Sequence, residues 1–211
     1  MHSILHRLLK PLCALLLGVG LFAAAGPGTA ADTPAAQAVE DTASRMLVAL
    51  KQQREALRAD PSKIYGLVER IAVPRFDFEA ISQWVLGRNW RGASPEQRQR
   101  FTAEFQNLLV RIYSNALLEY SDETVRFLPG AAPNADGDVL VRSEFVRRAG
   151  PAVPINYSVH QKNGQWLVYD VTVDGVSLVA NYRTTFANQV RDQGMDGLIA
   201  SLAKLNASGG R

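Results

Sequence analysis

VPINYSVHQKNGQWLVYDVTV, residues 153–173, consists of two runs in which apolar and polar residues alternate, joined at Asn163-Gly164. An Asn-Gly pair between such runs favours the two-residue turn of a β-hairpin. The turn sets the register, so Val159 is expected opposite Val168 and Tyr157 opposite Asp170. We therefore predict an antiparallel hairpin here.

The alternation also predicts which side chains share a face of the hairpin. One face is expected to carry Ile155, Tyr157, Val159, Trp166 and Val168. The other face is expected to carry Leu167, Tyr169, Val171 and Val173 with Asn156, Ser158 and His160. Neither face is cleanly polar, unlike a sheet with one side in water. We expect a sheet that is covered on one side and curls around something on the other.

Helices and two more strands surround the hairpin in sequence. Alternation predicts strands at 124–128, 139–148, 153–161 and 165–173. Upstream, Ser94-Pro95-Glu96-Gln97 is a capping box, and three-four spacing of apolar residues to Tyr120 predicts a helix of roughly 35 to 40 Å. Shorter helices are expected near 39–50, after Asp60-Pro61 and after Asp77, and two more follow the strands on either side of Gly194.

This order of elements predicts an α+β fold. We expect N-terminal helices, a long central helix, a curved four-stranded antiparallel sheet and C-terminal helices to enclose an apolar pocket, as an elaborated NTF2-like fold. Residues 32–211 are expected to form a single mature domain, either throughout or with a small helical lobe at 36–90.

The N-terminus has the parts of a secretory signal peptide. Arg7 and Lys10 precede an apolar run, LCALLLGVGLFAAA at 12–25, that is too short to span a bilayer. Small residues follow, so we expect a Sec-type signal cleaved near Ala30 or Ala31 and a periplasmic mature chain. An uncleaved anchor is the rival interpretation.

The available side chains exclude several classes of function. The single cysteine, Cys13, lies in the signal, and His160 is the only histidine after it, so thiol chemistry and Cys/His zinc sites are excluded. We expect no metal, no cofactor and no enzymatic activity. The 23 basic and 20 acidic residues become nearly balanced without Arg7 and Lys10, which argues against nucleic acid as a partner.

Two groups of polar residues are candidate sites. A His160–Asp170 acid–base pair is disfavoured, because the predicted register places the two on opposite faces. Arg88 and Arg91, near Trp90, could hold a phosphate head group by bidentate hydrogen bonds, as could Arg147. The alternative for each arginine is a solvated surface side chain.

Several short motifs carry a family resemblance. They are VLGRNW at 85–90, SPEQR at 94–98, FTAEF at 101–105, GQWLVYDV at 164–171, DGVSLV at 174–179, NYRTTF at 181–186 and GMDGL at 194–198. Together they resemble the MlaC family of periplasmic phospholipid-binding proteins, also called the toluene-tolerance auxiliary family. The resemblance covers essentially the whole mature chain.

The resemblance implies a soluble carrier that moves phospholipid between an outer-membrane Mla lipoprotein complex and an inner-membrane Mla ABC transporter complex, and so maintains outer-membrane lipid asymmetry. It also implies an apolar pocket for the acyl chains, with the head group exposed. A hopanoid-associated branch of the superfamily shares these motifs, so the ligand stays open between the two. We expect the carrier to be a monomer.

Positions on the long helix and the strands suggest which residues line the pocket, although each could be ordinary core. The candidates are Val85, Tyr113, Leu117, Phe127, Val141, Phe145, Tyr157, Val171 and Val176. Arg88, Arg91 and Arg147 are the candidates for contact with the head group or with an acidic partner. Two other classes remain: a small-molecule dehydratase or isomerase with a similar pocket, and an adaptor that binds only proteins and needs no cavity.

Overall fold

The computed structural model describes residues 33–119, 124–130, 132–147 and 150–208. The predicted signal peptide and its cleavage site lie outside these residues. The helices are α1 (Pro34–Gln52), α2 (Arg54–Ala59), α3 (Lys63–Ile71), the 3-10 helix η1 (Val73–Arg75), α4 (Phe78–Leu86), α5 (Arg88–Gly92), α6 (Pro95–Leu118) and α7 (Ala180–Ser208). The strands are β1 (Thr124–Phe127), β2 (Val139–Val146), β3 (Val153–Lys162), β4 (Gln165–Val173) and β5 (Val176–Ser177).

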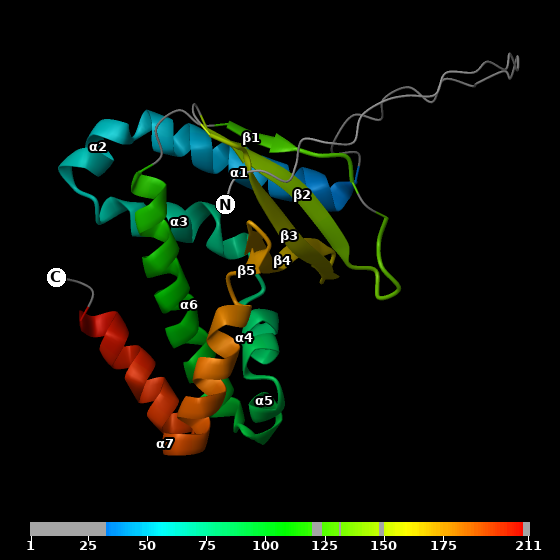
Figure 1. Ribbon diagram of the computed structural model, residues 1–211. Helices are drawn as coiled ribbons and strands as arrows, with labels where there is room; N and C mark the ends of the chain where they lie inside the picture. The colour runs from blue at the N-terminus through cyan, green and yellow to red at the C-terminus, as the bar shows by residue number, and fades with distance from the viewer. Residues whose placement is uncertain (1–32, 120–123, 131, 148–149, 209–211) are drawn as a thin grey trace, which may run out of the picture.

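The strands form one antiparallel sheet in the order β1-β2-β3-β4-β5 (Figure 1). The α+β fold is confirmed, and the four predicted strands are present. The fifth strand, β5, was not predicted because two residues are too few to show an alternating pattern. It follows a turn at Asp174-Gly175 and pairs with the end of β4.

The Asn163-Gly164 turn is confirmed. Both residues have positive φ, 52° and 76°, as a type I′ turn requires. A side chain at Gly164 would meet open space, so the cost of substitution there is conformational and not steric.

Gly164→Ala is therefore expected to lower the free energy of unfolding by about 1 kcal/mol, because an L-residue with a side chain disfavours positive φ. Urea titration measures this. The control is Gly92→Ala at the end of α5, where φ is not positive and space is also open. It should leave stability unchanged or slightly higher, and an equal loss in both variants would contradict the turn argument.

A β-bulge corrects the predicted register beyond the turn. Val159 lies opposite Val168 as predicted, but Ser158 lies opposite Asp170 and Tyr157 opposite Val171, with a register shift between Ser158 and Val159. The extra residue on β4 shifts the alternation of the following residues by one position. Val171 and Val173 thus join the face of Tyr157, and the predicted division of the two faces is wrong for this half of β4.

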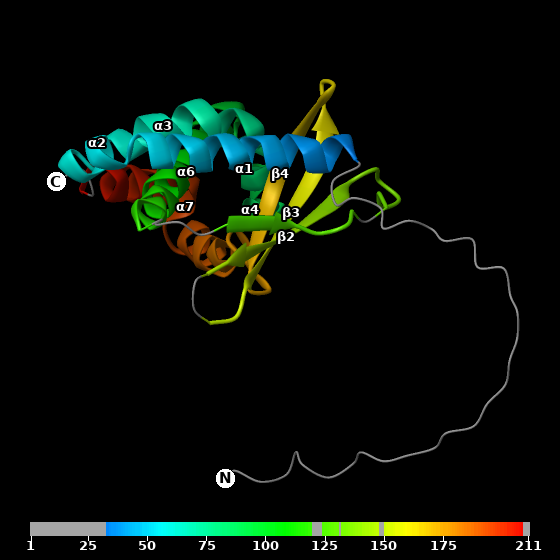
Figure 2. The ribbon, with the colours of Figure 1, turned by 90° about the horizontal axis from the view of Figure 1, so that it is seen from above.

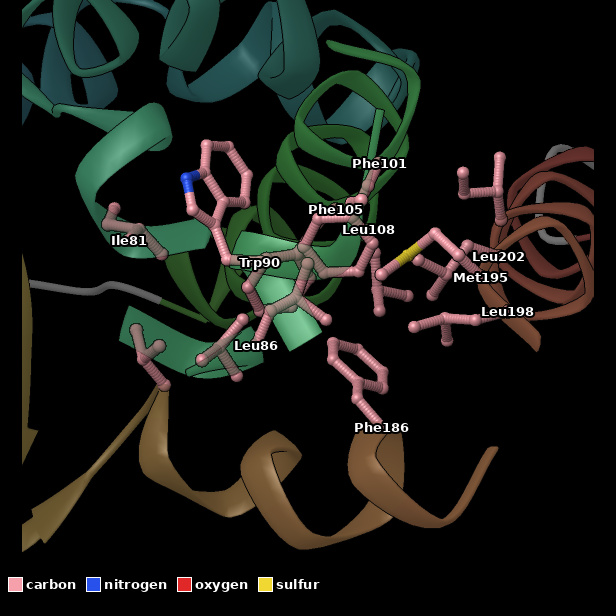
Figure 3. Close-up of a cluster of buried hydrophobic side chains, with 14 of the residues drawn as sticks. Ile81, Leu86, Trp90, Phe101, Phe105, Leu108, Phe186, Met195, Leu198 and Leu202 are labelled. Carbon is pink, nitrogen blue, oxygen red and sulfur yellow. The ribbon is translucent and has the colours of Figure 1, made fainter. Parts of the chain in front are cut away.

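Helix α6 begins as predicted. The Ser94 side chain accepts a hydrogen bond from the Gln97 amide, and the Gln97 side chain accepts one from the Ser94 amide. Phe101 and Phe105 project from α6 into a core formed with α4, α5 and α7 (Figure 3). Each lies 5 to 6 Å, centroid to centroid, from Phe186 of α7 in an edge-to-face arrangement. This core fixes α7 beside α6 (Figure 1).

The predicted interruption near the C-terminus is also present. Gly194 has φ 73° and ψ 176°, which are not helical angles, so α7 is kinked there. Beyond the kink, Asp196 accepts a hydrogen bond from Gln97 and forms an ion pair with Arg100, which ties the end of α7 to the start of α6.

The helices of residues 34–92 divide among three apolar clusters. Helix α1 runs across one face of the sheet (Figures 1 and 2), where Ala35, Ala36 and Val39 pack on valines of β2, β3 and β4. Helix α3 packs on α6, and α4 belongs to the core of Figure 3. In the described residues no helix has both the length and the apolar character needed to cross a membrane.

Candidate functional site

A cavity of about 570 Å³ lies between α1, the sheet and the end of α6. Its volume is in the range of roughly 300 to 1,000 Å³ usual for small-molecule sites. Most of its lining is apolar. The lining residues are Ala38, Val39, Thr42, Ala43, Met46, Leu47, Ala72, Arg75, Phe76, Ala116, Leu117, Glu119, Val125, Phe145, Arg147, Val153, Ile155, Tyr157, Trp166, Val168 and Val173.

Small side chains leave this volume unfilled. Ala38 and Ala43 on α1, Ala72 before η1 and Ala116 on α6 contribute single methyl groups to the wall. Larger residues at these positions would close the gap between helix and sheet to ordinary packing density. The β4 bulge also shapes the site, because it places Val173 opposite Ile155 in the cavity wall.

The cavity runs from buried to exposed residues. Val39, Met46 and Val168 are buried, whereas Glu119 and Arg147 are exposed. The Thr42 hydroxyl donates to the Ala38 carbonyl oxygen at 2.8 Å, so it adds little free polarity. Among the residues that the structure describes, the charged groups of the wall are Arg75, Glu119 and Arg147, and the other lining side chains form a mainly apolar surface.

Of the nine predicted pocket residues, Leu117, Phe145 and Tyr157 line this cavity. Phe127, Val141 and Val171 lie in the apolar cluster between α1 and the sheet but are not in its lining. Burial raises the pKa of the Tyr157 phenol, so this side chain is neutral at physiological pH.

The other three predicted pocket residues lie elsewhere. Val85 is buried in the core that contains Phe101, Phe105 and Phe186, because α4 packs it against α6 and α7. Tyr113 packs against that same core and donates to the Leu178 carbonyl oxygen, and burial raises its pKa to about 12. Val176 is 52% exposed on β5. Their helical and strand positions fit an apolar stripe, but that stripe faces a second core or solvent.

Sequence reasoning missed most of the cavity lining, including all six of its α1 residues and Arg75 of η1. The α1 residues are Ala38, Val39, Thr42, Ala43, Met46 and Leu47. Three of them, Ala38, Thr42 and Ala43, are small residues on an amphipathic helix. That feature could have marked a thinly packed face, although it is also found in closely packed helix contacts.

The three predicted arginines lie at two different cavities. Arg147 lines the apolar cavity and donates to the Pro151 carbonyl oxygen at 3.2 Å. Arg88 and Arg91 line a second cavity, of about 620 Å³, with His160 and Tyr169. His160 follows Val159 on β3 and Tyr169 follows Val168 on β4. Both valines belong to the apolar cluster between α1 and the sheet, on the side of the apolar cavity, so the two cavities lie on opposite faces of the sheet. Arg88 and Arg91 are therefore not placed to contact a ligand in the apolar cavity.

His160 pairs with Asp77 and not with Asp170. Its Nε2 atom lies 3.1 Å from Asp77 Oδ2, while Asp170 accepts from the Ser177 hydroxyl and the Val171 amide. Because of the bulge, Asp170 is opposite Ser158 and shares the face of His160, so the reason first given against this pair is wrong. Within the part of the chain that the structure describes, no cluster of His, Cys, Asp or Glu could hold a metal ion.

Known proteins are similar to this chain in sequence and fold. The MlaC protein family model matches residues 40–204. Toluene tolerance protein ttg2D from Pseudomonas putida is 31% identical over 79% of this chain and 77% of its own. Intermembrane phospholipid transport system binding protein MlaC from Haemophilus influenzae is 23% identical over 82% of each.

A solved structure agrees. The phospholipid-binding protein from Ralstonia solanacearum, determined in complex with a phospholipid, superposes with a TM-score of 0.77 at 32% identity, over 85% of this chain and 100% of that one. The resemblance first inferred from short motifs is confirmed along most of the chain. This chain belongs to the MlaC protein family.

Proposed function

We propose that this protein binds phospholipid, with the acyl chains in the apolar cavity between α1 and the sheet. The observation that carries the proposal is that cavity of about 570 Å³, walled by apolar side chains, in a fold shared with a protein solved with phospholipid bound. A hopanoid remains the alternative ligand, since it would also need an apolar enclosure.

The energetics of lipid transfer explain why a carrier needs such a cavity. About thirty methylenes in a two-chain lipid, at about 0.8 kcal/mol each, give roughly 24 kcal/mol for full exposure of the chains to water. Most of that surface must stay covered during transfer. Release then requires the cavity to open when a partner docks, because a ligand held so strongly leaves slowly unaided.

Native mass spectrometry with lipid extraction tests the ligand. The protein is expressed with its own leader, purified from the periplasm and weighed without denaturation. A co-purified phospholipid is the expected result, and extraction identifies its head group. A hopanoid would replace the proposed ligand, and a protein free of any lipid, also after incubation with phospholipid vesicles, would overturn the proposal.

The arginines of the apolar cavity are proposed to contact the lipid phosphate. Arg75 and Arg147 are the only cations in its described lining. The double variant Arg75→Ala/Arg147→Ala should bind phospholipid roughly three- to tenfold more weakly, since charge-assisted hydrogen bonds at a solvated edge are worth about 1 kcal/mol. Vesicle-to-protein transfer of a labelled lipid measures this.

The control for that measurement is Arg88→Ala/Arg91→Ala, which removes the same charge from the other face of the sheet. It should bind lipid as the parent does. Equal weakening in both double variants would mean that net charge matters and that Arg75 and Arg147 make no specific contact.

We also propose where the protein works. The leader predicts export, so the mature chain would act in the periplasm as a shuttle between the outer-membrane and inner-membrane Mla complexes. Its transport role requires no covalent chemistry, which agrees with a site made of apolar walls. Cell fractionation with N-terminal sequencing tests export, with a mature chain beginning at Ala31 or Asp32 as the expected result.

A further inference from the structure

The second cavity has an excess of positive charge. Its described lining has three guanidinium groups, from Arg88 and Arg91 of α5 and Arg183 of α7, and one carboxylate, Asp138. Asp138 accepts a hydrogen bond from the Tyr169 hydroxyl at 3.0 Å. All three arginines are exposed. Among the described residues, the guanidinium groups of Arg88 and Arg91 have no hydrogen-bond or ion-pair partner, so their charge is available to a ligand.

Arg183 is held in place before any ligand arrives. Its guanidinium lies over the Trp84 ring, 4.9 Å from the ring centroid. It also lies close to Gly87, where a Cβ atom would come within 3.3 Å of its Nη2 atom. Gly87 has φ 52°, which favours glycine there. A fixed guanidinium loses less entropy when it binds a carboxylate.

The residue types are those that dominate binding energy at protein interfaces. Tryptophan, tyrosine and arginine are enriched at such hot spots. Trp84 is 41% exposed beside Arg183, although most large apolar side chains of α4 are buried. A site with an exposed indole among three cations suits a polypeptide segment that carries several carboxylates more than a small anion.

The shape of this second cavity favours one of two kinds of acidic partner, a polypeptide segment, over the other, an anionic membrane surface. This hollow of about 620 Å³ is open to solvent, so a protruding polypeptide segment can contact its floor and its rim together, whereas a planar membrane surface would contact only the exposed arginines. From these observations we propose that this second cavity is a docking site for an acidic segment of a partner protein. It lies on the opposite face of the sheet from the apolar cavity, so partner and lipid can be bound together.

The test uses a blocked polyglutamate peptide as the acidic segment and a blocked polyglutamine peptide as its uncharged control. The mature protein should bind polyglutamate saturably, more weakly as salt rises, with a shift of the Trp84 indole resonance in NMR spectra. Arg88→Glu/Arg91→Glu should lower that affinity at least about tenfold, as loss of hot-spot contacts does. The lipid occupancy of this variant, measured by native mass spectrometry, should equal that of the parent.

The matched control is Arg45→Glu/Arg58→Glu, which changes the net charge equally at exposed arginines of α1 and α2. It should alter the affinity less than twofold. Equal loss in both variants would overturn the proposal in favour of net charge. The proposal would also be overturned if polyglutamate did not bind saturably. The same holds if phosphatidylglycerol vesicles bound through Arg88 and Arg91 and the peptide did not. None of these outcomes depends on whether lipid fills the apolar cavity.

Discussion

Ala43→Trp is expected to lower phospholipid binding by more than a hundredfold. Ala43 lies on α1 in the wall of the apolar cavity, and the indole would project into the space left by its methyl group. If the ring excludes about four methylenes of an acyl chain, the loss at about 0.8 kcal/mol each is about 3 kcal/mol. Lipid occupancy by native mass and transfer from labelled vesicles both measure it.

Val48→Trp is the matched control, because it places the same side chain on the same helix at a position 53% exposed to solvent. It should bind lipid as the parent does. Circular dichroism and urea titration check that Ala43→Trp folds, and Ala116→Trp, in the α6 part of the wall, provides a second way to fill the cavity. If both cavity-filling variants fold and still carry as much lipid as the parent, lipid binds elsewhere.

The features predicted best from sequence were those set by local interactions. The Ser94 capping box starts α6, and positive φ at Asn163 and Gly164 makes the hairpin turn. Each depends on a few neighbouring residues whose hydrogen bonds or allowed angles leave little choice of conformation. The α+β class followed from them because the order of helices and strands restricts how the layers can pack.

The features that failed depend on contacts between distant segments. No residue near Val168 indicates that β4 has one more residue than β3 at this point. The bulge at Tyr169 and the true partner of Tyr157, which is Val171, were therefore not predicted. Likewise, the spacing that puts Val85 on an apolar face does not say whether that face meets a cavity or the core of Figure 3. The candidate site was therefore predicted in kind, as an apolar pocket, but only in part by residue.

Asp77 is the buried carboxylate that connects α4 to the sheet. Its Oδ1 accepts a hydrogen bond from the Ala80 amide as the N-cap of α4, and its Oδ2 lies 3.0 Å from Lys162 Nζ and 3.1 Å from His160 Nε2. Its side chain is 4% exposed. Burial alone would raise the pKa of Asp77, but the hydrogen bond from Ala80 and the charges of Lys162 and His160 outweigh it and lower the pKa below 3.8.

Asp77→Ala is expected to lower the free energy of unfolding by about 3 kcal/mol at pH 7. The loss of the cap accounts for about 1 kcal/mol. The broken buried pair contributes the rest, less than the 3 to 5 kcal/mol of a fully buried pair, since Lys162 is 40% exposed and stays hydrated. Glu79→Gln is the control, because its ion pair with Lys162 is solvated and should contribute less than about 1 kcal/mol.

Asp77→Asn separates charge from capping, because asparagine also caps helices well. A carboxyl group whose pKa is lower in the folded state adds stability that is fully present above its unfolded pKa, near 4, and is lost as pH falls through the folded pKa. The difference in stability between parent and Asp77→Asn should thus be present at about pH 5 and shrink as the pH falls below 4. Urea titrations across this range measure it. A difference that persists unchanged at pH 3 would mean that Asp77 stabilises the α4–sheet contact by shape and hydrogen bonding, and that its charge contributes nothing.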